Sequence, residues 1–342
     1  GYICQFQAHL YYPNFLNRYS KALGDTAVVR EILTDNILHP MHGEGYKLRP
    51  QYAADLIHER AMQWLEQQTP DQPFLGIFTY TLPHAELAQP NDSIVAFYKE
   101  RFTEDKTWGG DQGSRYNPVD ATHTQFAAMI TRLDKQVGEI IDLLQRRGLA
   151  DNTIVFFTSD NGPHAEGGAD PAFFNAANLL RGIKRTTYEG GIRVPFIAWG
   201  PGIVPSGIVS SLPIAFYDMM PTFCDLAGID DYEARYRNPR ADYTDYFDGI
   251  SIAPTLRGEE GQQLHPHLYW ELGEANVLAV RRDHWKLVVR QGNPELYNLA
   301  NDLHEDHDVK EQYPEILSEL IDIVYQEHVD NPLFPITLPP RN

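Results

Sequence analysis

The chain has 342 residues, enough to bury a large core, and its 42% apolar and 12% aromatic content is that of a globular protein. Its 28 Lys and Arg against 47 Asp and Glu give a net charge of −19, which argues against general nucleic-acid binding because phosphate neutralisation needs a basic face. No apolar run is long enough to span a membrane, and Cys4 and Cys224 are too few and too far apart for a disulfide scaffold or a cysteine-built zinc site.

The apolar spacing predicts a half-buried helix over residues 51–68 and, after Pro70 and Pro73, a buried strand over FLGIFTY (74–80). A polar stretch through residue 118 separates this strand from a second helix over 122–147, which Gly148 ends as a C′ glycine. Further along the chain, the sequence predicts buried strands over TIVFFTS (153–159) and VPFIAW (194–199), and a helical segment over 214–228.

The repeated order of helix, short loop and apolar strand predicts an α/β fold with a mostly parallel central sheet flanked by helices. After about residue 264 the pattern changes to closely spaced short strands, HLYWEL, NVLAVRR, HWKLVV and ELYNL, and a terminal helix, PEILSELIDIVYQEHV. This pattern predicts a small antiparallel sheet packed by a helix. We therefore predict an α/β core over 1–263 and a C-terminal α+β domain over 264–342.

Two predicted strands are followed directly by polar groups. Strand 74–80 leads to Pro83-His84, and strand 153–159 leads to Asp160-Asn161. Parallel strands would place both groups at one carboxyl edge of the sheet, where open α/β sheets bind ligands. Asp and Asn oxygens suit Ca²⁺ or Mg²⁺, although two ligands fall short of the about six to eight oxygens of a calcium site. The alternatives are an ordinary Asp-Asn-Gly turn and a structural histidine.

A third cluster lies in LLRGIKRTTYEGGIRVPF (179–196). Here Arg181, Lys184, Arg185 and Arg193 stand beside three glycines. In a strongly acidic chain this basic segment predicts an anion site, and the alternative is a solvated basic loop.

The segments FLGIFTYTLPHAE, TSDNGPHAEGG and RGIKRTTYEGGIRVPF, in this order, resemble the formylglycine-dependent type I sulfatases of the alkaline-phosphatase-like superfamily. LYNLANDLHED (296–306) extends the resemblance to the C-terminal part of the chain. The resemblance implies an alkaline-phosphatase-like fold and a Ca²⁺ ion bound by Asp160 and Asn161. It also implies two catalytic residues: His84, which contacts the sulfate and the leaving oxygen, and Lys184, which binds a sulfate oxygen. Glu189, with the two glycines after it, is expected to shape the loop.

The same resemblance favours a sulfated polysaccharide or glycosaminoglycan-type sugar as substrate, and a periplasmic or secreted location. His9, Glu86 and His164 are candidates for contacts to substrate hydroxyls, with a structural role as the alternative for each.

One family feature is absent from the sequence. Type I sulfatases make their formylglycine from a Cys/Ser-x-Pro/Ala-x-Arg motif, whereas Cys4 lies in CQFQA and Cys224 in CDLAG. The early Asp-Asp calcium pair of the family is absent too. We therefore expect the formylglycine in a missing N-terminal segment and no activity from these residues alone. Two other functions remain open: a phosphate or phosphonate ester hydrolase of the same superfamily, and a non-catalytic relative that binds sulfated glycans.

Overall fold

The computed structural model describes residues 2–3, 10–19, 28–103, 106–110, 116–232 and 248–341. They divide into two compact units, the first made of residues 1–150 and 164–176 and the second of residues 151–163 and 177–342. Across the described ranges, no helix combines the length and the apolar character that crossing a bilayer requires.

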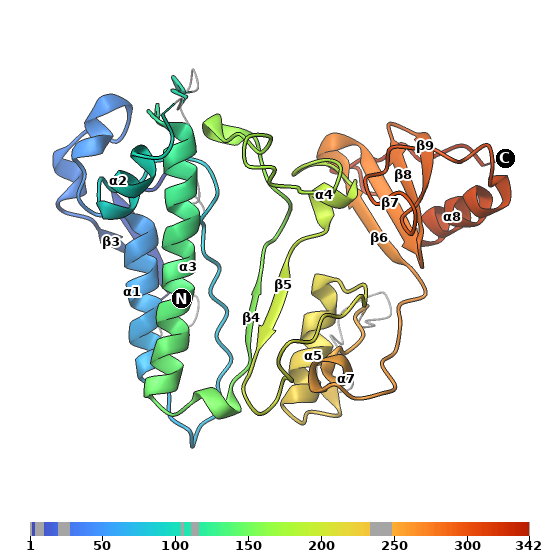
Figure 1. Ribbon diagram of the computed structural model, residues 1–342, viewed down its shortest axis with the longest axis horizontal. Coiled ribbons are helices and arrows are strands. Elements are labelled where there is room, and N and C mark those ends of the chain that lie inside the picture. The colour runs from blue at the N-terminus through green and yellow to red at the C-terminus, as the bar shows by residue number, and fades with distance from the viewer. Residues whose placement is uncertain are drawn as a thin grey trace. The chain divides into compact units, whose positions relative to one another are not determined.

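The first unit combines a small antiparallel sheet with three helices (Figure 1). The sheet has the order β1 (Tyr2–Ile3), β2 (Phe15–Tyr19) and β3 (Val28–Ile32). The helices are α1 (Ala53–Glu66), α2 (Ser93–Lys99) and α3 (Thr122–Arg146), with short 3-10 helices η2 (Asn36–Leu38), η3 (Gly43–Leu48) and η5 (Glu166–Gly168). Helices α1 and α3 coincide closely with the segments predicted from apolar periodicity.

A buried arginine ties the three helices of this unit together. Arg132 of α3 is 7% exposed, and its guanidinium lies 3.2 Å from Asp55 Oδ2 of α1 and pairs with Asp92. Asp92 also caps α2 by accepting a hydrogen bond from the Ile94 N–H at 3.0 Å. One cation therefore satisfies carboxylates from two neighbouring elements, as a buried charge requires.

Residues 74–80, predicted as a strand, are extended but belong to no described sheet, so this prediction is wrong in its pairing. Phe74 and Phe78 pack against Trp64 of α1, each with ring centroids 5.8 Å apart from the indole. Leu75 and Ile77 point away and are 59% and 69% exposed. The near-continuous apolar run predicted a buried strand, but a β-strand also needs a hydrogen-bonded neighbour, which a local pattern does not specify.

The second unit begins with β4 (Val155–Thr158), which pairs with β5 (Phe196–Trp199). The two strands are antiparallel, with Val155 opposite Trp199 and Thr158 opposite Phe196, and so depart from the predicted parallel arrangement. A parallel neighbour needs a connection that crosses back to the starting edge, whereas this chain re-enters through α4 (Glu189–Ile192) at the edge where β4 ends. Short helices complete this part: η4 (Ala150–Asn152), η6 (Phe216–Asp218), α5 (Met219–Leu226) and α7 (Ala253–Arg257).

The C-terminal part of the second unit is the predicted antiparallel sheet with its helix. The strands follow in order as β6 (Leu268–Leu272), β7 (Val277–Arg282), β8 (Trp285–Arg290) and β9 (Asn293–Asn298), with η7 (Gly273–Ala275) after β6. Helix α8 (Pro314–Glu327) packs on the sheet through Leu320 and Val324, which are fully buried. Both faces of β7 and β8 are buried: Leu278 and Leu287 lie in the cluster formed with α8, and Ala279 and Val288 lie in a second cluster with Tyr188. The domain boundary at residue 263 stays a prediction.

Candidate functional site

His84 lies in a turn of the first unit, just beyond the extended segment 74–80. Its backbone is held by Tyr11, a fully buried tyrosine whose hydroxyl donates hydrogen bonds to His84 O at 2.7 Å and to Thr81 O at 3.2 Å. The side chain remains 23% exposed, and its Nε2 atom lies 3.7 Å from Glu166 Oε2.

His164, a predicted substrate-binding residue, packs directly against His84. The two imidazole rings are stacked with centroids 5.7 Å apart. His164 Nε2 lies 3.0 Å from Pro83 O, and His164 Nδ1 accepts a hydrogen bond from the Glu166 N–H at 3.1 Å. Since a carbonyl only accepts and an amide N–H only donates, these partners assign the proton to Nε2. These contacts fit the structural alternative, in which His164 supports the turn that carries His84.

Glu86 is fully buried beside the same turn. Its Oε1 accepts a hydrogen bond from the Tyr11 N–H at 3.1 Å, and its Oε2 accepts one from the Asn117 N–H at 2.9 Å. These contacts also fit a structural role, because they join three separate segments of the first unit. His9, the third residue predicted to contact substrate, lies outside the described residues.

Glu86 is expected to make the stability of the protein depend on pH. Burial raises the pKa of Glu86 from 4.5 to about 6, against the opposing effect of its hydrogen bonds from Asn117 and Tyr11. The folded state therefore holds this proton more tightly than the unfolded chain, and the free energy of unfolding should fall by about 2 kcal/mol in total as the pH rises from well below 4.5 to well above 6.

Urea denaturation of the parent and of Glu86→Gln, measured across this pH range, checks the expectation. The parent should lose stability relative to Glu86→Gln as the pH rises, while Glu100→Gln, an exposed glutamate at the end of α2, should follow the parent. A parent–variant difference that stays constant from pH 4.5 to pH 6 would contradict it.

In the second unit, Asp160 and Asn161 follow β4 after one intervening residue, Ser159. The Asp160 side chain is exposed, and Asn161 Nδ2 donates a hydrogen bond to Gly162 O at 2.8 Å. This bond orients the amide, and the Ser159 hydroxyl fixes the turn by donating to Asn161 O at 2.9 Å. These residues can therefore form the turn and also bind a metal ion, because the turn uses the Asn161 amide nitrogen and leaves the Asp160 carboxylate at the surface.

The loop that carries Lys184 is joined to this turn through its backbone. The Lys184 N–H donates to Pro163 O at 2.8 Å, and the Gly162 N–H donates to Gly191 O at 2.9 Å. A Cβ atom on Gly162 would lie 1.8 Å from Gly190 O, so only glycine permits this approach. The structure therefore brings Asp160, Asn161 and Lys184 onto two adjoining backbone segments.

The four cations of the basic segment have different roles in the structure. Arg181 donates to Glu305 O at 2.5 Å, and Arg193 and Arg185 form ion pairs with Glu189 and Glu274 at 3.4 and 3.7 Å. These three arginines hold the loop or pair on its surface. Lys184 stays the residue predicted to bind an anion, as the family resemblance implies.

The donor atoms of Asp160 and Asn161 fit a calcium ion in kind, since both side chains offer hard oxygen atoms. Two side chains are, however, too few to complete the ligand shell of a calcium ion. Among the residues that the structure describes, no group of three or more His, Cys, Asp or Glu side chains is arranged to hold a metal ion. These two residues could therefore supply only part of a calcium shell.

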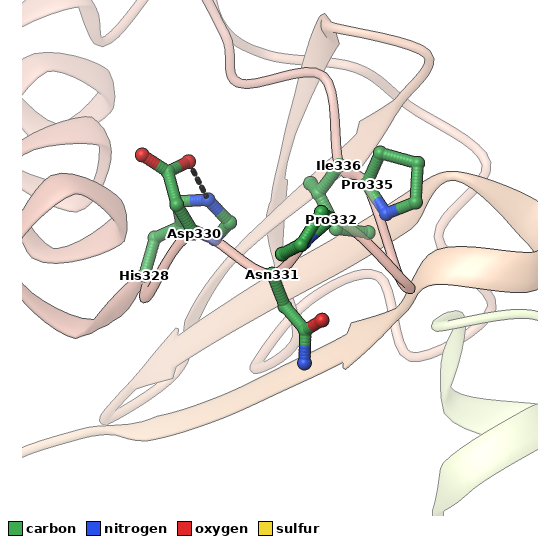
Figure 2. Close-up of a pocket in the computed structure, with 6 residues that line it drawn as sticks. All are labelled: His328, Asp330, Asn331, Pro332, Pro335 and Ile336. Carbon is green, nitrogen blue, oxygen red and sulfur yellow. Dashed lines mark hydrogen bonds and ion pairs between the residues drawn. The ribbon is translucent and has the colours of Figure 1, made fainter.

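A shallow pocket of about 280 Å³ near the C-terminus contains none of these residues (Figure 2). Its lining is formed by His328, Asp330, Asn331, Pro332, Pro335 and Ile336. Burial lowers the pKa of His328, but bonds to Glu271 at 2.6 Å and Asp330 at 3.2 Å raise it more, and the net direction is upward. His328 is thus committed to carboxylates of its own unit, and the pocket carries no candidate chemistry.

Sequence reasoning missed two features: Glu166 beside His84, and the buried lysine Lys286, which contacts Glu189 at 2.8 Å. Glu166 follows His164 closely in HAEGG and could have been found there, but nothing in the sequence around Lys286 marks it as different from a surface lysine.

Known proteins that are similar to this chain in sequence are named as sulfatases. The sequence is 28% identical over 294 residues to a sulfatase of Formosa agariphila, covering 78% of this chain and 47% of that protein. It is 32% identical over 184 residues to N-acetylgalactosamine-6-sulfatase of Homo sapiens, covering 49% of this chain and 33% of that one. The chain thus spans half or less of the length of these relatives.

Among solved structures, Ps i-CgsB in complex with k-i-k-neocarrahexaose superposes with a TM-score of 0.64 at 25% identity, covering 84% of this chain and 57% of that one. The structural neighbours confirm the predicted alkaline-phosphatase-like α/β fold with its small C-terminal antiparallel sheet. The family model named Sulfatase matches residues 5–229. The chain belongs to the sulfatase family.

Proposed function

We propose that the whole protein hydrolyses sulfate esters of sugars, with a sulfated polysaccharide or glycosaminoglycan-type sugar as substrate. Family membership supports the reaction. The observation that carries the proposal for this chain is the hydrogen bond from the Lys184 N–H to Pro163 O at 2.8 Å, which places the backbone of Lys184 beside the Asp160–Asn161 turn. The Lys184 ammonium group, and a Ca²⁺ ion held by the hard oxygen ligands of the adjoining turn, would both attract a sulfate group.

Sulfate-ester cleavage requires stabilisation of negative charge on the sulfate oxygens and a proton for the poor alkoxide leaving group. We assign the first task to Lys184, whose ammonium group would bind a sulfate oxygen. The second task is assigned to His84, whose side chain is 23% exposed and lies 3.7 Å from the Glu166 carboxylate. Glu189, buried and ion-paired, has a shaping role in this proposal.

Asp160 and Asn161 are proposed to hold part of the shell of a Ca²⁺ ion, which when bound would polarise the ester and offset the charge of the sulfate. Further ligands and the formylglycine nucleophile are proposed to come from outside residues 1–342, because neither Cys4 nor Cys224 stands in the motif that is converted. Substrates of this size and charge are consistent with a periplasmic or secreted enzyme.

The relatives support a carbohydrate substrate. One is named for N-acetylgalactosamine 6-sulfate, and the solved structure of Ps i-CgsB holds k-i-k-neocarrahexaose. The direct test measures sulfate released by the purified whole protein from sulfated oligosaccharides, with phosphate monoesters and phosphonate esters assayed alongside. Release of phosphate in preference to sulfate would assign the protein to the other hydrolases of the superfamily, and binding of sulfated glycan without turnover would make it a non-catalytic relative.

Lys184→Ala is expected to lower kcat about 100- to 1,000-fold, because the variant loses a charge that acts on the sulfate oxygens in the transition state. The loss should appear with both a sulfated sugar and a small aryl sulfate, since the sulfate group is common to them. The matched control is Arg185→Gln, which removes the neighbouring cation that pairs with Glu274 on the surface and should leave kcat unchanged. A loss confined to the sugar substrate would move Lys184 to sugar recognition.

A further inference from the structure

Three charged side chains form a buried cluster in the second unit. Lys286 of β8 and Glu305, in the turn after β9, are fully buried, and Glu189, the first residue of α4, is 2% exposed. Lys286 Nζ donates a hydrogen bond to Glu189 Oε1 at 2.8 Å and lies 2.9 Å from Glu305 Oε1. Glu305 Oε2 accepts a hydrogen bond from the Glu189 N–H at 2.7 Å. The cluster therefore anchors α4 to the β6–β9 sheet, beside which it lies (Figure 1).

Stability alone is a weak explanation for this cluster. Removing charges from water costs about as much free energy as their attraction returns, and apolar residues of similar size often stabilise such positions equally well or better. Burial raises the pKa of Glu189, but Lys286, Arg281 and Arg193 lower it below its ordinary value, whereas burial keeps the pKa of Glu305 above its ordinary value. The cluster instead holds α4 in one defined position against the β6–β9 sheet.

That geometry is transmitted to the candidate site by close backbone contacts. The Gly190 N–H donates to Arg181 O at 2.7 Å, and Gly191 O accepts from the Gly162 N–H at 2.9 Å. A Cβ atom on Gly190 would lie 2.4 Å from Gly182 O, so there is no free space between α4 and the loop before it. Interiors packed this closely transmit displacement, and a shift of α4 must shift both the Asp160 turn and the Lys184 loop.

A second contact fixes the other side of the same loop. Arg181 donates to Glu305 O at 2.5 Å and to the Tyr297 hydroxyl at 3.2 Å. Its guanidinium also lies over the Tyr188 ring, 4.1 Å from the centroid. The turn that carries Glu305 thus holds the loop at Arg181 through its backbone and at Glu189 through its side chain.

We propose that Lys286 and Glu305 are positioning residues of the sulfatase site. Acting through Glu189, they hold the backbone that presents Lys184 and Asp160, so that the C-terminal sheet determines the geometry of groups far from it in the sequence. This inference rests on the proposed function for its catalytic consequence.

The test compares Lys286→Met with its parent in the whole protein. Methionine keeps most of the volume and removes the charge. We expect kcat for sulfate release to fall about 100-fold, with KM within about threefold of the parent, because a displaced catalytic group costs rate more than binding. The control is His265→Gln, which breaks the 2.7 Å contact of His265 with the fully buried Asp218 in the same unit, away from both loops. It should lower the melting temperature without lowering kcat.

Lys286→Met leaves two buried carboxylates without a lysine and could impair folding for that reason. The triple variant Lys286→Met, Glu189→Gln, Glu305→Gln removes all three charges and keeps an acceptor for the Glu189 N–H. It should fold with a melting temperature near that of the parent and still show the reduced kcat. A triple variant that folds with the parental kcat would overturn the proposal.

Amide hydrogen exchange provides a reading that does not depend on activity. The Gly162, Lys184 and Gly190 amides should exchange about tenfold faster in the triple variant than in the parent, and at the parental rate in His265→Gln. Unchanged exchange at these amides would also overturn the proposal. If the parent itself releases no sulfate, the proposed function fails, while faster exchange in the triple variant would still establish that the cluster positions the loop.

Discussion

Replacing Asp160 with alanine in the whole protein is expected to abolish both calcium binding and sulfate release. Asp160 offers the only carboxylate of the two proposed ligands on this chain, and its side chain is exposed at the end of β4 rather than used within the turn. Calcium affinity depends strongly on the charge of its ligands, so the loss of a carboxylate should exceed the loss of the neutral Asn161 amide. Activity should be lost with the ion, because the ion is proposed to polarise the ester.

Two measurements check this expectation together: calcium bound per protein after dialysis, and the initial rate of sulfate release with calcium in excess. Asp151→Ala is the matched control, since Asp151 is also exposed and lies just before the same strand, at its opposite end. It should retain both properties. Stoichiometric calcium in Asp160→Ala would remove Asp160 from the ligand set, whatever its effect on turnover.

His84→Ala is expected to lower kcat on a sugar sulfate about 100- to 10,000-fold, as the loss of a general acid does. The leaving group decides the size of the effect. A sugar alkoxide needs a proton as it departs, whereas a nitrophenolate is stable without one, so the loss on a nitrophenyl sulfate should be clearly smaller but still measurable. KM should change little for either substrate if His84 acts on the reacting oxygen.

The control for His84→Ala is His42→Ala, an exposed histidine of the same unit that has no role in the proposed reaction. Its kinetic constants should match those of the parent. A higher KM for the sugar, with full activity on the nitrophenyl sulfate, would assign His84 to sugar recognition in place of proton transfer.

The helices of this protein are determined by local sequence. The apolar spacing predicted segments 51–68, 122–147 and the terminal helix, and the structure has helices over Ala53–Glu66, Thr122–Arg146 and Pro314–Glu327. A 3.6-residue period is set within a few turns of one segment, and it needs no knowledge of what the segment packs against. The closely spaced strands after residue 264 were predictable for the same reason, because antiparallel neighbours joined by short turns pair locally.

The sequence also identified the candidate residues, since His84, Asp160 and Lys184 each stand in a distinctive motif. It did not determine how they are supported. In a parallel sheet the segment before residue 194 would start at the edge opposite Asp160, and only the antiparallel pairing of β4 with β5 brings Lys184 beside the Asp160 turn.

The buried contacts behind these residues were decided by tertiary structure alone. Lys286 is separated from Glu189 by 97 positions, and Arg132 from Asp55 by 77. In the sequence each is a charged residue that a solvated surface would accept equally well. Whether such a residue is buried with a partner depends on which distant segments the fold places against it, and no periodicity or motif near the residue carries that information.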